Sequence, residues 1–115
     1  ACNVLMSIRH PCIASLHGLC VDEQNGILAP VLECVEGETL EAFVLSHSTE
    51  PIKVCTRHRL LMDVGSALWY LHDQQPMVAH GTLKGSKVMV EMRLAGPRAK
   101  LLDYGWNAFL SKQVV

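Results

Sequence analysis

The feature that most constrains the fold is a run of apolar residues with helical spacing between residues 56 and 75. Apolar side chains that recur every three or four residues lie along one face of a helix. Thr56 is a residue type that caps helix N-termini, and Pro76 cannot continue a helix, so we expect the helix to lie between them. The chain must therefore supply other elements to cover the apolar face. We expect that face to consist of Leu60, Leu61, Val64, Ala67, Leu68 and Leu71.

Many of the remaining apolar residues fall into short β-prone runs that form two hairpins. These runs cover residues 13–21, 27–33, 88–92 and 99–102. Asn25-Gly26 separates the first two runs and supplies the positive φ angles of a tight hairpin turn. We place the second turn at Gly96-Pro97. The chain thus combines helical segments with short strands, which predicts a mixed helix-and-strand fold.

Two shorter helical segments are expected besides the long one. Residues 1–9 have the spacing of a helix end, which Pro11 stops. Thr39 is a good cap for a second short helix that continues to Ser46.

Composition narrows the function classes. Hydrophobic residues make up 50% of the 115 residues and charged residues 18%, which excludes a disordered chain. The net charge is −1 without a block of like charge, so we expect no nucleic-acid partner. The longest apolar runs are far shorter than a membrane span requires. A chain of this size buries only part of its surface, so the apolar surplus indicates a protein partner or another covering surface.

The cysteines and histidines give no sign of a metal site. The five cysteines are an odd number without C-x-x-C spacing, which argues against a disulfide framework and a zinc site. The six histidines form no H-x-x-x-H pair. A reducing, intracellular compartment, such as the cytoplasm, fits these free thiols best.

Five segments stand in an order that carries more information than any one of them. RHPCIASLHGLC is followed by VLECVEGETL, LMDVGSALWYLH, HGTLKGSKVMV and AKLLDYG. The last two occupy the places of the H-R-D-L-x-x-x-N catalytic loop and the D-F-G motif, and the whole order resembles the protein kinase family. Lys84 stands two residues after the catalytic Asp position, as in the D-L-K form of serine/threonine and tyrosine-kinase-like branches.

The resemblance implies a partial kinase domain of the α+β class. It would run from the end of helix αC through the fourth and fifth strands, the hinge, αD, αE, the catalytic loop and the hairpin of the seventh and eighth strands. Residues 1–32 would be a remnant of the small lobe, residues 33–38 the hinge and residues 39–115 the start of the large lobe.

The resemblance also shows where catalytic residues are replaced. Thr82 stands at the position of the catalytic Asp, and a neutral hydroxyl is no proton acceptor at neutral pH. Lys87 replaces the metal-binding Asn, leaving Asp103 as the one retained metal carboxylate. Lys87 could pair with Asp103 or point to solvent. Gly81 replaces the Arg of the catalytic loop, and Ala1 falls at the αC Glu position.

Other matched positions are retained. Leu32 matches the gatekeeper, the hinge residues would bond an adenine ring through their backbone, and Met89 would lie beneath that ring. A column of side chains would connect the two lobes, although such positions can also be ordinary core. The hinge residues are Glu33, Cys34 and Val35, and the column is Leu5, Leu16, His80 and Tyr104.

Three functions remain open. The leading hypothesis is a pseudokinase that acts as an interaction or allosteric module, with ATP and Mg²⁺ implied by the resemblance but poorly supported by the altered catalytic loop. The second is part of an active serine/threonine-type kinase with an unusual base. The third is a truncated copy without selected function.

Overall fold

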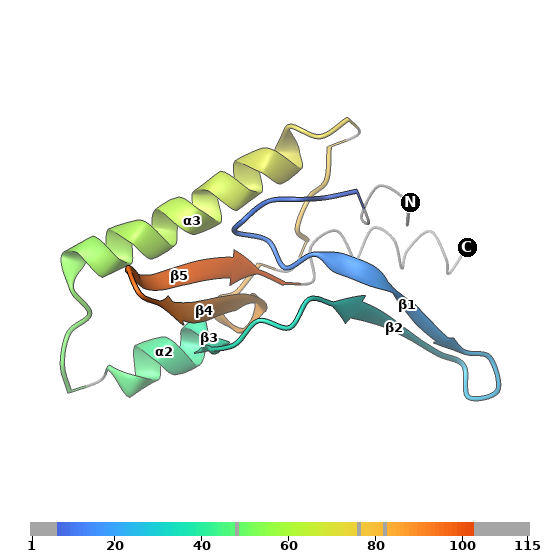
Figure 1. Ribbon diagram of the computed structural model, residues 1–115, viewed down its shortest axis with the longest axis horizontal. Coiled ribbons are helices and arrows are strands. Elements are labelled where there is room, and N and C mark those ends of the chain that lie inside the picture. The colour runs from blue at the N-terminus through green and yellow to red at the C-terminus, as the bar shows by residue number, and fades with distance from the viewer. Residues whose placement is uncertain (1–6, 48, 76, 82, 103–115) are drawn as a thin grey trace.

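The computed structural model describes residues 7–47, 49–75, 77–81 and 83–102. Figure 1 shows the long helix α3 (Val54–His72) lying along the three-stranded sheet, with the short helix α2 (Leu40–Ser46) at one end. The hairpin of β1 (Leu16–Asp22) and β2 (Ile27–Leu32) extends from the other end. The mixed helix-and-strand fold predicted from the sequence is confirmed.

The β1–β2 hairpin is antiparallel, as predicted, but its turn is longer than expected. Asp22 pairs with Ile27, which leaves a four-residue loop rather than a tight turn through Asn25-Gly26. The Asp22 carboxylate accepts hydrogen bonds from the backbone nitrogens of Gln24 and Asn25 at 3.1 and 3.3 Å. Gly26 closes the loop at φ +66°, a conformation that favours glycine.

Strand β1 begins at Leu16 and not at residue 13, because the preceding backbone is already bonded elsewhere. Leu101 donates its N–H to the carbonyl of Cys12, and Ala14 donates to the carbonyl of Leu101, both at 2.9 Å. Ile13 thus forms a parallel bridge with Leu101, which ties this segment to the other sheet.

Helix α2 is capped as predicted, since the Thr39 hydroxyl accepts a hydrogen bond from the Ala42 N–H at 3.1 Å. Just before it lies β3 (Glu38–Thr39), a two-residue strand that the sequence analysis did not foresee. A Cβ on Gly37 would lie 2.0 Å from the Val90 carbonyl oxygen, and its φ is +153°. Glycine is therefore required where this segment joins the sheet.

Helix α3 begins two residues before the predicted cap. Lys53 is its N-cap and gives no side-chain bond, while Arg57 donates its N–H to the Lys53 carbonyl, so Thr56 already lies within the first turn. The prediction that Leu61 faces the core was also wrong, because its side chain is 71% exposed. Leu60, Ala67 and Leu71 are buried as predicted, and Asp63 is buried with them. Val64 and Leu68 pack half-buried against the core.

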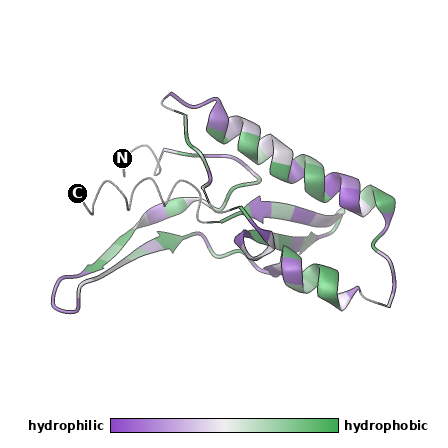
Figure 2. Cartoon of the chain, turned by 180° about the vertical axis from the view of Figure 1, so that it is seen from behind, coloured by the Kyte–Doolittle hydropathy of each residue, from purple (hydrophilic) through white to green (hydrophobic). Residues whose placement is uncertain are grey.

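The second hairpin pairs β4 (Val88–Arg93) with β5 (Gly96–Leu101) and lies in a sheet of order β3-β4-β5. Its turn is Leu94–Ala95, and Gly96 and Pro97 belong to the strand, contrary to the prediction. Gly96, the first residue after the turn, adopts φ +117°, a conformation that favours glycine. Figure 2 shows apolar and polar residues mixed along the sheet and α3, and the buried residues of these elements meet in one core.

Candidate functional site

The segment after α3 is anchored to the core and to the end of β5. Val78 is buried and donates its N–H to the carbonyl of Leu71 at 2.9 Å. His80 is 3% exposed, and its Nε2 donates to the carbonyl oxygen of Leu102 at 2.6 Å. A carbonyl oxygen only accepts, so His80 carries a proton on Nε2. His80, the first residue of the segment that resembles the catalytic loop, is therefore hydrogen-bonded to Leu102, the residue before Asp103.

Lys87 lies next to the same strand end. It closes the 3₁₀ turn Gly85–Lys87, in which its N–H donates to the Lys84 carbonyl at 2.9 Å. Its own carbonyl accepts the N–H of Leu102 at 2.8 Å. The position that resembles the metal-binding Asn therefore lies beside the residue immediately before Asp103. Lys84 itself is exposed.

Several predicted site residues lie outside the described part of the chain. These residues are Ala1, Leu5, Thr82, Asp103 and Tyr104. Their roles stay predictions. Of the predicted lobe-connecting column, Leu16 and His80 are both buried in the described part of the chain.

The predicted nucleotide residues lie on β2, just after it, and on β4. Leu32, Glu33 and Val35 are half-buried, Cys34 is exposed, and Met89 is half-buried on β4. Leu32 packs against the core cluster. Met89 pairs across the sheet with Lys100, and Lys100 in turn contacts Glu33. Lys100 on β5 therefore contacts the segment that resembles the hinge and also pairs with β4, the strand that carries Met89.

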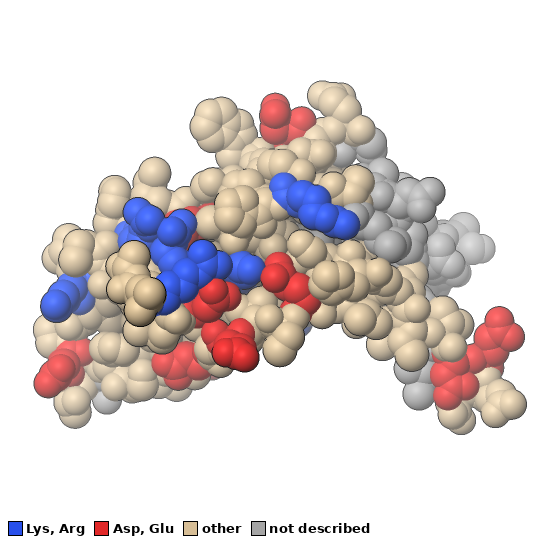
Figure 3. Space-filling view, in the orientation of Figure 1, with Lys and Arg blue, Asp and Glu red and all other residues tan. Residues whose placement is uncertain are grey.

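The Glu33 carboxylate has two partners that the sequence analysis missed. One oxygen accepts the Ser15 N–H at 2.9 Å, and the other accepts from Lys100 Nζ at 3.1 Å. Burial alone would raise the pKa of Glu33, but the Ser15 and Lys100 hydrogen bonds outweigh it and lower this pKa. The carboxylate therefore stays ionised at neutral pH. Figure 3 shows basic and acidic side chains side by side on the face that includes β5.

A second charged cluster was also missed. Asp63 is 4% exposed and accepts two hydrogen bonds from Arg98, both at 2.9 Å, and one from the Ala99 N–H at 3.0 Å. Burial would raise the pKa of Asp63, but these donors lower it below its usual value. Burial and the nearby carboxylate raise the pKa of the Cys12 thiol. The available signal was a carboxylate among the apolar residues of the core-facing side of the helix, because such a group needs a partner when it is buried.

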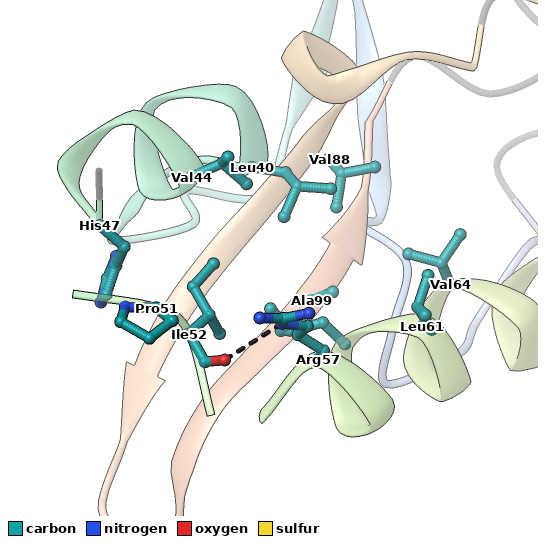
Figure 4. A pocket seen from close by; sticks show the side chains of 11 residues that line it. Leu40, Val44, His47, Pro51, Ile52, Arg57, Leu61, Val64, Val88 and Ala99 are labelled. Atoms are coloured by element: carbon teal, nitrogen blue, oxygen red, sulfur yellow. Dashed lines mark hydrogen bonds between the residues drawn. The ribbon is translucent and has the colours of Figure 1, made fainter. Parts of the chain in front are cut away.

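An apolar cavity of about 450 Å³ lies between α2, the start of α3 and the sheet (Figure 4). Arg57 is one of the residues that line this cavity, and its Nε donates a hydrogen bond to the Ile52 carbonyl oxygen at 3.1 Å. The lining includes none of the residues predicted for catalysis or nucleotide binding. Its residues include Leu40, Val44, Leu60, Val64, Val88 and Ala99.

Two kinds of feature are absent from the described residues. No group of three His, Cys, Asp or Glu side chains there is placed to hold a metal ion. None of the helices in the described ranges combines the length and apolarity needed to cross a membrane.

Comparisons with curated proteins agree with the segment order. The chain is 28% identical over 103 residues to U-box domain-containing protein 32 of Arabidopsis thaliana, covering 90% of this chain and 12% of that protein. It is 33% identical over 110 residues to salt tolerance receptor-like cytoplasmic kinase 1 of Oryza sativa, covering 90% of this chain and 29% of that protein. The chain thus spans less than a third of either relative.

Solved structures show the same fold. The kinase domain of Mycobacterium tuberculosis PknI matches with a TM-score of 0.76 at 21% identity, over 90% of this chain and 39% of that one. The kinase domain of maize sucrose-induced receptor kinase 1 matches with a TM-score of 0.75, also at 21% identity, over 89% of this chain and 35% of that one. The family description "Protein tyrosine and serine/threonine kinase" matches residues 1–114. The chain therefore belongs to the protein kinase family, of which it holds part of the domain.

Proposed function

We propose that this chain belongs to a serine/threonine-type kinase domain that does not transfer phosphate and acts as an interaction or allosteric module. The position of Lys87 carries the proposal. Its carbonyl bonds the N–H of Leu102, so the residue at the metal-binding Asn position lies beside the residue before Asp103. An ammonium group there replaces an oxygen ligand that Mg²⁺ needs and repels the ion.

The second support is Thr82 at the catalytic Asp position. Phosphoryl transfer uses that Asp to accept or orient the proton of the incoming hydroxyl. General-base assistance typically contributes about 100-fold to 10,000-fold to the rate. A threonine hydroxyl lacks this proton affinity, so the proposed site loses both a base and a metal ligand.

Nucleotide binding is proposed separately from catalysis. The hinge match at residues 33–35 follows β2 directly, and Glu33 is held by contacts on two sides. The maize kinase domain with the same fold was solved bound to AMP-PNP. We propose that an adenine nucleotide binds this hinge without the Mg²⁺ that supports transfer in active kinases. The residues do not fit a tight metal site, because Lys87 stands where a ligand is needed.

A protein partner is the proposed target of the module. Exposed apolar side chains on α2 and α3, together with the neighbouring cavity, offer surface for such a partner. The cytoplasm is the proposed compartment, which the free cysteines favour.

The effect of Mg²⁺ on nucleotide affinity tests the proposal. ADP is titrated into the full chain with EDTA and then with Mg²⁺, using calorimetry. We expect the wild-type dissociation constant to be unchanged by Mg²⁺, and Lys87→Asn to gain at least about fivefold from the metal. Lys53→Asn, which removes an exposed lysine outside the catalytic-loop match, is the matched control and should gain nothing. A wild-type affinity that Mg²⁺ improves as much as it does in Lys87→Asn would refute the metal argument.

An active serine/threonine kinase is the second candidate, favoured by the relatives of that description. The double change Thr82→Asp with Lys87→Asn separates the two. Our proposal expects transfer to a protein acceptor to appear only in the double variant. Equal turnover in the wild-type chain would favour the active kinase.

A further inference from the structure

The cavity between α2 and the start of α3 has an apolar lining that continues onto the surface. Val88 and Ala99 of the sheet line it and are buried. Val44 of α2 and Leu61 of α3 line it as well, and both side chains are exposed. Its volume of about 450 Å³ falls in the range of pockets that bind ligands and partner side chains. An apolar surface of this kind favours an occupant that covers it with apolar groups.

The segment that forms one wall of the cavity is basic. Residues 51–62 hold three cations, Lys53, Arg57 and Arg59, and no Asp or Glu. Arg59 lies 4.0 Å from the Asp63 carboxylate. Arg57 lines the cavity, and within the described ranges neither it nor Lys53 forms an ion pair with a carboxylate (Figure 4). Two positive charges at the cavity are therefore not neutralised by the part of the chain that the structure describes.

These two cations stand where a helix disfavours them. Lys53 is the N-cap of α3, and Arg57 follows it by four residues. The N-terminus of a helix carries a partial positive charge, so cations there are unfavourable and anions favourable. Like charges four residues apart on a helix also repel each other. The first turn of α3 holds no acidic residue, and Lys53 gives no capping bond from its side chain. A carboxylate brought to this end of the cavity would relieve both repulsions.

We propose that the cavity between α2 and α3 binds an acidic amphipathic helix of a partner protein. Its apolar side chains would enter the cavity, and one of its carboxylates would pair with Arg57 in the positive field of Lys53. This inference deepens the proposed role as an interaction module and rests on it. An arginine and a carboxylate form charge-assisted hydrogen bonds, which are stronger than neutral ones. A helix that lays its apolar face into a groove is a general mode of peptide recognition.

Two synthetic peptides test the charge requirement. The first is a capped, alanine-based helical peptide with leucines along one face and glutamates beside them, and the second has glutamine in place of every glutamate. Binding of each labelled peptide to the full chain is followed by fluorescence anisotropy at low salt. We expect the glutamate peptide to bind about fivefold more tightly than the glutamine peptide. This ratio should fall at high salt, because salt screens exposed charges.

Two arginine variants locate the charge. Arg57→Gln should reduce the affinity ratio of the two peptides to about twofold or less. Arg59→Gln removes the same charge two residues away, beside Asp63 and outside the cavity lining, so it is the matched control and should keep the wild-type ratio. Both arginines are exposed, and circular dichroism checks that each variant keeps the fold.

Leu61→Gln tests whether the peptides occupy the cavity. Leu61 is exposed and lines the cavity, so the variant should weaken binding of both peptides by about fivefold or more. Trp69→Gln replaces another exposed apolar side chain of α3 outside the cavity lining and should change neither affinity.

Three results would overturn the proposal. One is equal affinity for the two peptides, or an equal effect of Arg57→Gln and Arg59→Gln. Another concerns a second copy of this chain as the occupant: we expect sedimentation to show a monomer, and a dimer that Leu61→Gln and Arg57→Gln both dissociate would contradict the proposal. The third is that neither peptide binds, which would remove the interaction role from this cavity. The Mg²⁺ titration described above decides the proposed loss of catalysis independently of all three.

Discussion

Replacing Asp63 with Asn tests the packing of α3 against β5. Asn has nearly the same size, but its amide group is neutral and carries its own N–H donors. In the wild-type protein, Asp63 accepts three hydrogen bonds from Arg98 and Ala99 at 2.9 to 3.0 Å. The variant would leave the Arg98 charge without its anion and place an NH₂ group against at least one donor.

The magnitude follows from burial. Removing one partner of a buried ion pair costs about 3–5 kcal/mol. The Asp63 side chain is 5% exposed but that of Arg98 is 27% exposed, so water screens part of the loss. We therefore expect Asp63→Asn to lower the free energy of unfolding by about 2–4 kcal/mol. With a urea slope of about 1–3 kcal/mol/M, the midpoint should fall by about 0.7 to 4 M.

Urea denaturation followed by circular dichroism measures this change. Arg59 offers the control, because its Nε lies 4.0 Å from Asp63 while its side chain is 56% exposed. Arg59→Ala should change the free energy of unfolding by less than about 1 kcal/mol. Replacing both partners, as Asp63→Leu with Arg98→Met, should cost less than Asp63→Asn, since no buried charge is left unpaired. If Asp63→Asn were as mild as Arg59→Ala, the buried pair would not hold α3 to β5.

Three further predictions concern pH, a glycine and a cap. The pKa values of Asp63 and Glu33 are lowered in the folded protein, so their stabilisation is complete above their unfolded values and is lost as pH falls through the folded ones. Stability should therefore decline below about pH 4, and less steeply in Asp63→Asn, as urea midpoints at several pH values would show. Gly37→Ala should destabilise the chain by more than about 1 kcal/mol, because its Cβ would lie 2.0 Å from the Val90 carbonyl oxygen; Gly18→Ala, with open space around it, is the thermal-melting control. Thr39→Ala should cost about 1 kcal/mol by removing the cap of α2, while Thr39→Ser should retain most of it; equal melting temperatures for both would contradict the capping role.

The sequence predicted the elements whose signal is local. The apolar period located α3, Thr39 located the start of α2, and Asn25-Gly26 located the first hairpin. Boundaries were less accurate because they depend on the surrounding structure. Cys12 and Ala14 bond Leu101, so Ile13 forms a bridge to the other sheet instead of extending β1. Leu94 and Ala95 form the second turn because Gly96 already pairs with Arg93.

The site was predictable only where a family pattern exists. Thr82 and Lys87 were identified by their place in that pattern, which no composition or period would give. The polar contacts could not be read from the chain, because Asp63 and Arg98 are 35 residues apart and Glu33 and Lys100 are 67 apart. Asp63 shows what a periodic pattern omits, since it occupies a core position that such a pattern assigns to an apolar residue.

Transfer of the γ-phosphate tests the central claim most directly. The full chain is incubated with Mg²⁺ and γ-labelled ATP and with myelin basic protein as acceptor, and incorporated label is counted beside an Asp103→Ala sample. We predict the same background incorporation in both. Incorporation well above background in the wild-type chain that disappears in Asp103→Ala would contradict the account.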